Sequence, residues 1–199
     1  MAQTQSRLLA LPPELCNLIW DLALLHNTSI QLGHYTEEDD ECIGEIAQPS
    51  LALVNRQLRF EALPIYYSAN TFALNTTRSG EWDSTFKWLR ANKHHLVHLR
   101  KLQSSGYSCW NKPGDEGDEE CVTLMSVGID VGLWPRRDMI SIATCDIYDE
   151  AIEHGEAQKE RLDALICGHM EGRVKGRLTG DEWAEVFGAL CGILDWRWD

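Results

Sequence analysis

Residues 8–24 read "LLALPPELCNLIWDLAL", and this stretch decides how the chain begins to fold. Pro12 and Pro13 suit the first turn of a helix, because that turn needs no backbone N–H and proline already has a helical φ. Glu14 then stands near the positive end of the helix dipole. Apolar residues recur at helical spacing after it, which predicts a helix with one apolar face made of Leu15, Leu18, Ile19, Leu22 and Leu25.

A second helix is predicted to begin at Pro49. Pro64 is expected to end or kink it near Leu63, because the residue before a proline disfavours the helical conformation. The apolar face of this second helix consists of Leu51, Val54, Leu58 and Ala62. A short strand, "TFAL" (71–74), is predicted to follow.

The middle of the chain is expected to be rich in strands. A third helix, "GEWDSTFKWLRANKHH" (80–95), places Trp82, Phe86 and Leu89 on one side. Strand character follows in 96–102, 121–132 and 138–147, where β-branched residues are frequent. An acidic loop joins the first two of these strands, as in a long hairpin.

The last third of the chain is predicted to be helical. Residues 149–170 carry apolar side chains at core spacing. Thr179 and Glu182 then form a capping box, in which each residue satisfies a backbone N–H of the other. The helix that follows is expected to bury Trp183, Val186, Phe187, Leu190 and Leu194.

The net charge of −13 is concentrated in two segments. Residues 37–45 hold six acids and residues 115–120 hold five, with no Lys or Arg in either, so the rest of the chain has 20 acids against 18 bases. Such runs repel themselves and are expected to form solvated loops. Because neither offers a surface that neutralises phosphates, no nucleic-acid partner is predicted.

Cysteine usage and hydropathy favour an intracellular protein. The seven cysteines form no Cys-x-x-Cys pair and no even framework, which is typical of reduced thiols in the cytosol or nucleus. The first residues lack the apolar core of a secretory signal, and no apolar stretch is long enough to cross a membrane. The expected localisation is cytoplasmic or nuclear, with no membrane partner.

No pattern of catalytic residues is found. A Gly-x-Ser-x-Gly elbow, a His-Glu-x-x-His motif and a Gly-rich phosphate loop are all absent from the sequence. His94, His95 and His98 lie close together, but no further ligand stands at zinc-site spacing beside them. We therefore expect no metal, no cofactor and no enzymatic activity.

Two segments read together resemble a known family. "LPPELCNLIWDL" (11–22) followed by "SLALVNRQLR" (50–59) resembles the F-box pattern, although Asn55 and Leu58 stand where that pattern has Cys and Trp. The longer string, over about residues 7–104, is similar to fungal F-box-like proteins, which continue with segments like "EALPIYYSANTFAL" and "HLRKL".

The resemblance implies an α+β fold, with F-box-like N-terminal helices packed on a small antiparallel β-sheet and C-terminal helices. Residues 1–78 are then an F-box-like helical segment with an acidic insertion, and residues 79–199 an α/β remainder packed against it.

The resemblance also implies a non-catalytic adaptor that recruits substrates to a cullin-type ubiquitin ligase through a Skp-type adaptor. The partner-binding residues that it implies are Leu11, Pro12, Leu15, Ile19, Leu22, Val54 and Leu58. Two alternatives stay open at this point: a free-standing fungal interaction or host-targeted protein that has lost adaptor docking, and an enzyme of an unrecognised type. Whether Leu15, Ile19 and Val54 are exposed distinguishes the adaptor from the free-standing interaction protein.

Overall fold

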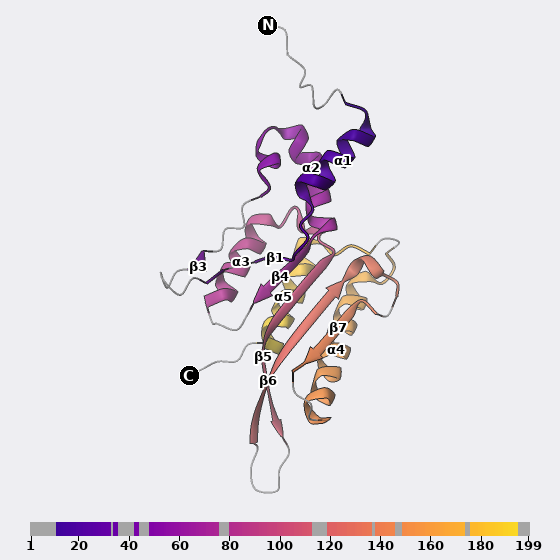
Figure 1. Ribbon diagram of the computed structural model, residues 1–199. Coiled ribbons are helices and arrows are strands. Elements are labelled where there is room, and N and C mark those ends of the chain that lie inside the picture. Colours follow the sequence, from indigo (N-terminus) through magenta and orange to yellow (C-terminus); the bar gives the residue numbers. More distant parts are fainter. Residues whose placement is uncertain are drawn as a thin grey trace.

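The computed structural model describes residues 11–32, 34–35, 42–43, 48–75, 80–112, 119–136, 138–145, 149–173 and 176–194 (Figure 1). The helices in these ranges are α1 (Pro13–Leu24), α2 (Arg56–Ala69), α3 (Gly80–Asn92), α4 (Asp149–Met170) and α5 (Gly180–Leu194), with short 3-10 helices η1 (Ser50–Leu53), η2 (Leu96–His98) and η3 (Val131–Leu133). The strands are β1 (Ile30–Gln31), β2 (His34–Tyr35), β3 (Cys42–Ile43), β4 (Thr71–Asn75), β5 (Lys101–Lys112), β6 (Glu119–Asp130) and β7 (Ile140–Thr144). The fold is therefore α+β, as predicted.

The main sheet is mixed, in the order β1-β4-β5-β6-β7, and β2 and β3 form a separate antiparallel pair. β1, β4 and β5 run parallel, whereas β5, β6 and β7 run antiparallel. The expectation of a wholly antiparallel sheet is therefore wrong for its first half. The physical reason is the helix between β4 and β5: α3 carries the chain back, so the two strands start from the same end.

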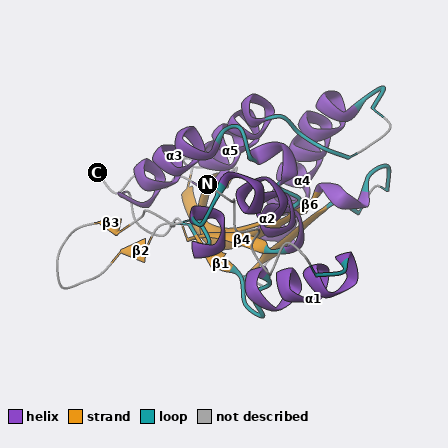
Figure 2. Cartoon of the chain, turned by 90° about the horizontal axis from the view of Figure 1, so that it is seen from above, coloured by secondary structure: helices purple, strands orange, loops and turns teal. Residues whose placement is uncertain are grey.

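Helices cover one face of this sheet. Figure 2 shows α3, α4 and α5 on one side of the strands, and Figure 1 shows α1 beside α2, beyond the end of the sheet. Burial along β5 agrees, because Leu102, Ser104 and Ser108 are buried and alternate with the exposed Lys101 and Gln103. On the second face, the exposed residues described in β5, β6 and β7 are Lys101, Gln103, Ser126, Ser141 and Ala143.

The predictions for the C-terminal helices agree best with the structure. α4 has the predicted bounds, and all five predicted side chains of α5 are buried in the main core. The capping box is also confirmed: the backbone N–H of Glu182 donates to Thr179 Oγ1 over 3.3 Å, and the N–H of Thr179 donates to Glu182 Oε2 over 2.6 Å.

The second predicted helix is divided into two parts. Pro49 precedes η1, and the chain then turns at Val54 before α2 begins. Asn55 has an extended backbone there, and its side chain accepts a hydrogen bond from the N–H of Leu58 over 2.8 Å, which makes it the N-cap of α2.

The expectation that the helix ends at Pro64 is wrong, because α2 continues through this proline to Ala69. An interior proline costs a helix about 3 kcal/mol. Beyond the proline, however, α2 buries Tyr66 and Tyr67, whose rings pack on Phe72 at centroid distances of 5.6 and 5.5 Å. Burying two large aromatic side chains, each of about 150–250 Å², explains why the helix tolerates the interruption.

The expected strand at 96–102 is also wrong in most of its length. Residues 96–98 form η2, and β5 begins only at Lys101. The hairpin of β5 and β6 is confirmed, and residues 113–118 connect the two strands. Most of both acidic runs, and the side chain of Trp82, lie outside the described residues.

Candidate docking surface

Helix α1 is apolar on two opposite faces. Trp20 and Leu24, four residues apart, are 3% and 0% exposed and therefore share a buried face. The leucines of the predicted stripe lie on the other side and are exposed, with Leu22 at 80%. This outer surface, which we call the leucine face, consists of Leu15, Leu18, Leu22 and Leu25.

The buried face of α1 packs on α2. Trp20 and Leu24 form a small apolar cluster with Leu58 and Ala62, and this cluster is separate from the main core, to which the sheet, α3–α5 and the C-terminal half of α2 contribute. Partly buried side chains at its margin are Cys16, Ile19, Leu51 and Ile65. The helix pair therefore has its own core, and α1 is stabilised mainly by α2.

A buried asparagine fixes this pair of helices. Asn70, the C-cap of α2, donates from Nδ2 to the backbone carbonyls of Leu24 and Tyr66 over 2.8 and 2.9 Å. Its Oδ1 accepts from the backbone N–H of His26 over 2.8 Å. The last carbonyl of α1 and the N–H just beyond its end thus meet a single side chain, which sets the rotation of α1 and hence the direction of the leucine face.

Apolar side chains are also exposed beside α1. Leu53 and Val54, at the end of η1, are about two-thirds exposed, and Phe60 on α2 is 82% exposed. Of the eight large apolar side chains that are exposed in the described part of the chain, seven lie between Leu15 and Phe60. The four leucines of the leucine face share one side of α1, and a contiguous exposed apolar surface often marks a site that binds a partner.

A groove of about 450 Å³ opens between α1 and α2. Trp20, Cys16 and Ile65 contribute apolar wall, and Gln57 donates to Glu61 at the rim over 3.1 Å. The remaining lining residues are Leu11, Pro13 and Asn17. The groove adds a concave surface to the same helix pair.

The structure places the seven expected docking residues in three environments. Pro12, Leu15, Leu22 and Val54 are exposed, and Leu11 and Ile19 are half-buried. Leu58 is only 2% exposed, so its expected place on the docking surface is corrected: it packs beneath α1 in the helix-pair core. The exposed members come from α1 and from the turn after η1.

Several residues of this region were not assigned to the site from the sequence. Leu18 and Leu25 belong to the leucine face and share its helical spacing, which is the signal that includes them. Leu53 and Phe60 stand outside the predicted apolar faces, so periodicity does not mark them. Asn70 follows α2 directly, but nothing in its sequence neighbourhood indicates a bond to Leu24, which is 46 residues away.

The histidine cluster takes part in packing. The ring of His95 stacks on Tyr67 at 5.8 Å, and burial, together with the charges of His94 and Arg59, lowers the pKa of His95. Burial also lowers the pKa of His98. Among the residues that the structure describes, no three His, Cys, Asp or Glu side chains are grouped closely enough to hold a metal ion.

Comparison with known proteins finds no matching family model, no matching curated protein and no matching solved structure. In the described ranges, none of the helices combines the length and apolar character needed to span a bilayer.

Proposed function

We propose that the chain is a non-catalytic adaptor that docks a protein partner on the leucine face of α1. One observation carries the proposal: α1 buries Trp20 and Leu24 against α2 while it exposes Leu18 and Leu22 on its opposite side. A surface helix normally turns one apolar stripe toward the core and polar residues toward water, so a second, exposed apolar stripe points to a partner. A partner that covers the leucine face would bury this helix on both sides.

The partner that we propose is a Skp-type adaptor of a cullin ubiquitin ligase. The similarity of residues 7–104 to fungal F-box-like proteins supports this choice, since the exposed leucines lie on the helix that carries the Leu-Pro-Pro-Glu start. The F-box-like arrangement of α1, η1 and α2 is part of the same proposal. The remainder of the chain would then hold a substrate.

Hydrogen bonds hold the helices that carry the proposed docking surface. Asn70 ties the end of α1 to α2, and Asn55 caps α2 at the turn that presents Val54. A surface that is already held in place loses little conformational entropy when it binds, which favours affinity. A few apolar anchors then carry most of the binding energy.

The test is a calorimetric titration of the purified chain with a purified fungal Skp-type adaptor. The variant Leu18→Gln with Leu22→Gln should weaken binding about tenfold or more, because two central apolar anchors are lost. Ile152→Gln on α4 is the matched control, since Ile152 is the one exposed large apolar residue described outside this region, and it should bind like the wild type.

Either of two results overturns the proposal. If the wild-type chain does not bind the adaptor, the alternative of a free-standing interaction protein is favoured. If Leu18→Gln with Leu22→Gln binds as tightly as Ile152→Gln, the leucine face is not the docking surface.

A further inference from the structure

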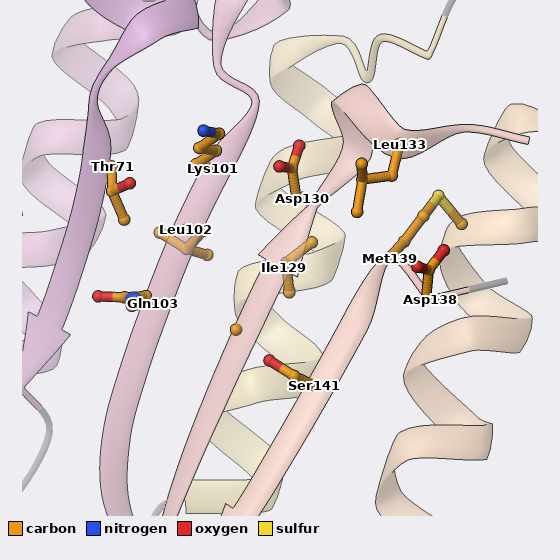
Figure 3. Close-up of a pocket in the computed structure, with 11 residues that line it drawn as sticks. Thr71, Lys101, Leu102, Gln103, Ile129, Asp130, Leu133, Asp138, Met139 and Ser141 are labelled. Carbon is orange, nitrogen blue, oxygen red and sulfur yellow. The ribbon is translucent and has the colours of Figure 1, made fainter. Parts of the chain in front are cut away.

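A second depression lies far from the leucine face in the sequence, on the open face of the sheet. It has a volume of about 260 Å³ and lies where β5 and β7 begin and β6 ends (Figure 3). Leu133 and Met139 form its apolar side, beside the turn that leads from β6 to β7. Its polar side chains come from four strands and the turn: Thr71, Lys101, Gln103, Asp130, Asp138 and Ser141.

A glycine keeps this depression open. Gly128 is paired with Gln103 and Ser141 on the neighbouring strands, and its position faces the open side of the sheet. A Cβ at this position would lie 2.6 Å from Ser141 Oγ, inside the depression. A glycine within a strand often marks a place where a ligand or another chain approaches the backbone closely.

Two of the charged residues of the depression are neighbours in the sheet, and the third lies in the turn before β7. Lys101 is the register partner of Asp130, and the N–H of Asp130 donates to the carbonyl of Met139, the residue after Asp138, over 2.8 Å. Asp130 Oδ1 accepts from the N–H of Gly132 over 2.9 Å, so this carboxylate is held in place. No ion pair within 4.0 Å joins Lys101, Asp130 or Asp138 to another charged group in the described part of the chain.

We propose that this depression binds an arginine side chain of an extended segment in a protein partner. Among the charged side chains that line the depression, two carboxylates against one ammonium favour a cation, and the planar guanidinium can donate two parallel hydrogen bonds to a carboxylate such as that of Asp130. Leu133, which is half-buried, offers apolar surface to the aliphatic stem of the side chain. The net charge of −13 attracts basic segments over longer distances.

This site extends the proposed adaptor function, because an adaptor needs a second surface to hold its client. The two sites share no residue, since the leucine face belongs to α1 and the arginine site belongs to the sheet. Each is therefore tested separately, and loss of one does not predict loss of the other.

The test uses the full ¹⁵N-labelled chain and the peptide acetyl-Gly-Ser-Gly-Ser-Arg-Ser-Gly-Ser-Gly-amide. Titration should shift the amide signals of Gln103, Gly128 and Ser141. The same peptide with Gln in place of Arg should bind at least about fivefold more weakly, and the peptide with Glu weaker still, as expected for an exposed ion pair.

Two variants and a control test whether binding depends on the shape of the depression and on its charge. Gly128→Val fills the depression and should abolish the shifts. Asp130→Asn with Asp138→Asn should weaken binding about tenfold, while the new amide oxygen at position 130 still accepts from the N–H of Gly132. Ser126→Val is the matched control, because Ser126 is exposed on the same strand and face but outside the depression. Equal binding of the Arg and Gln peptides, or shifts that persist in both Gly128→Val and the double Asp→Asn variant, would overturn the proposal.

Discussion

The side-chain amide of Asn70 donates a hydrogen bond to the backbone carbonyl of Leu24, 2.8 Å away, across the contact of α2 with α1. Leu24 is the last residue of α1, and its carbonyl has no partner within the helix. The same asparagine accepts from His26, so both sides of the helix end are held. The direction of the leucine face thus depends on one buried polar residue that belongs to another helix.

Asn70→Ala should lower the free energy of unfolding by about 2–3 kcal/mol. It leaves the carbonyl of Leu24 and the N–H of His26 without their partner, and each unsatisfied buried group costs about 1–3 kcal/mol. Urea unfolding of the variant measures the loss. Asn27→Ala, at an exposed position just after α1, is the control and should change stability by less than about 0.5 kcal/mol.

Two phenylalanines provide a matched pair for the core. Phe187 on α5 is fully buried and Phe60 on α2 is 82% exposed. Phe187→Ala should cost about 3–5 kcal/mol from lost burial and the cavity left behind, whereas Phe60→Ala should be close to neutral. Thermal or urea unfolding measures both variants. If Phe187→Ala loses as little stability as Phe60→Ala, α5 does not belong to the main core.

Substitution of Leu58 is expected to lower the stability of the chain, whereas substitution of Val54 is not. Leu58→Ala should destabilise the chain by about 2–5 kcal/mol, because the side chain is buried between α1 and α2. Val54→Ala should leave stability within about 0.5 kcal/mol of the wild type, because Val54 is exposed. Chemical denaturation measures both. A destabilised Val54→Ala variant would place this residue in the core.

The capping box of α5 predicts a pH dependence. Burial alone would raise the pKa of the Glu182 carboxyl, but hydrogen bonds from Arg173 and Thr179 outweigh it and lower this pKa from 4.5 to about 2. Arg173 donates to both carboxylate oxygens, over 3.0 Å to Oε2, and also to the carbonyl of Arg177 over 2.7 Å. Glu182 therefore links the end of α4 to the start of α5.

Glu182→Gln should lower stability by about 2 kcal/mol at pH 7, where the carboxylate is ionised in the folded and the unfolded chain. As the pH falls from 4.5 to about 2, the unfolded chain takes up a proton before the folded chain does, so the advantage of the wild type should disappear over this interval. Glu156→Gln, on the exposed side of α4, is the control. A difference between wild type and Glu182→Gln that is independent of pH would rule out the ion pair as its source.

Periodicity and capping chemistry predicted the elements that rest on local rules. Residues 149–170 and the capping box of Thr179 and Glu182 agree with the structure because helix spacing and N-terminal caps are local signals. β5 was largely missed, since its buried positions include Ser104, Gly106 and Ser108, which lack the apolar alternation of a strand. The helices that cover this strand supply its burial, and their position is not a local property.

In the candidate site, too, local sequence signals predicted the helix but not how it packs. The apolar stripe of α1 was found from spacing, but its direction was not, because two apolar stripes compete for the contact with α2. Trp20 and Leu24 occupy that contact, and the larger area of the Trp20 side chain favours its burial over that of Leu22. The bond from Asn70 to Leu24 then holds this choice, and no sequence pattern indicates a bond between such distant residues.

Docking of a Skp-type adaptor on the outer face of α1 can be followed by methyl NMR of the chain with ¹³C-labelled leucine δ-methyl groups, titrated with the purified adaptor. Leu15, Leu18, Leu22 and Leu25 should shift, whereas Leu24, which is buried against α2 on the same helix, should change little. That pattern would show that the partner covers the outer face of α1 and leaves the helix pair intact. If the adaptor binds without shifting Leu18 and Leu22, or produces no shifts at all, the leucine face is not its docking surface.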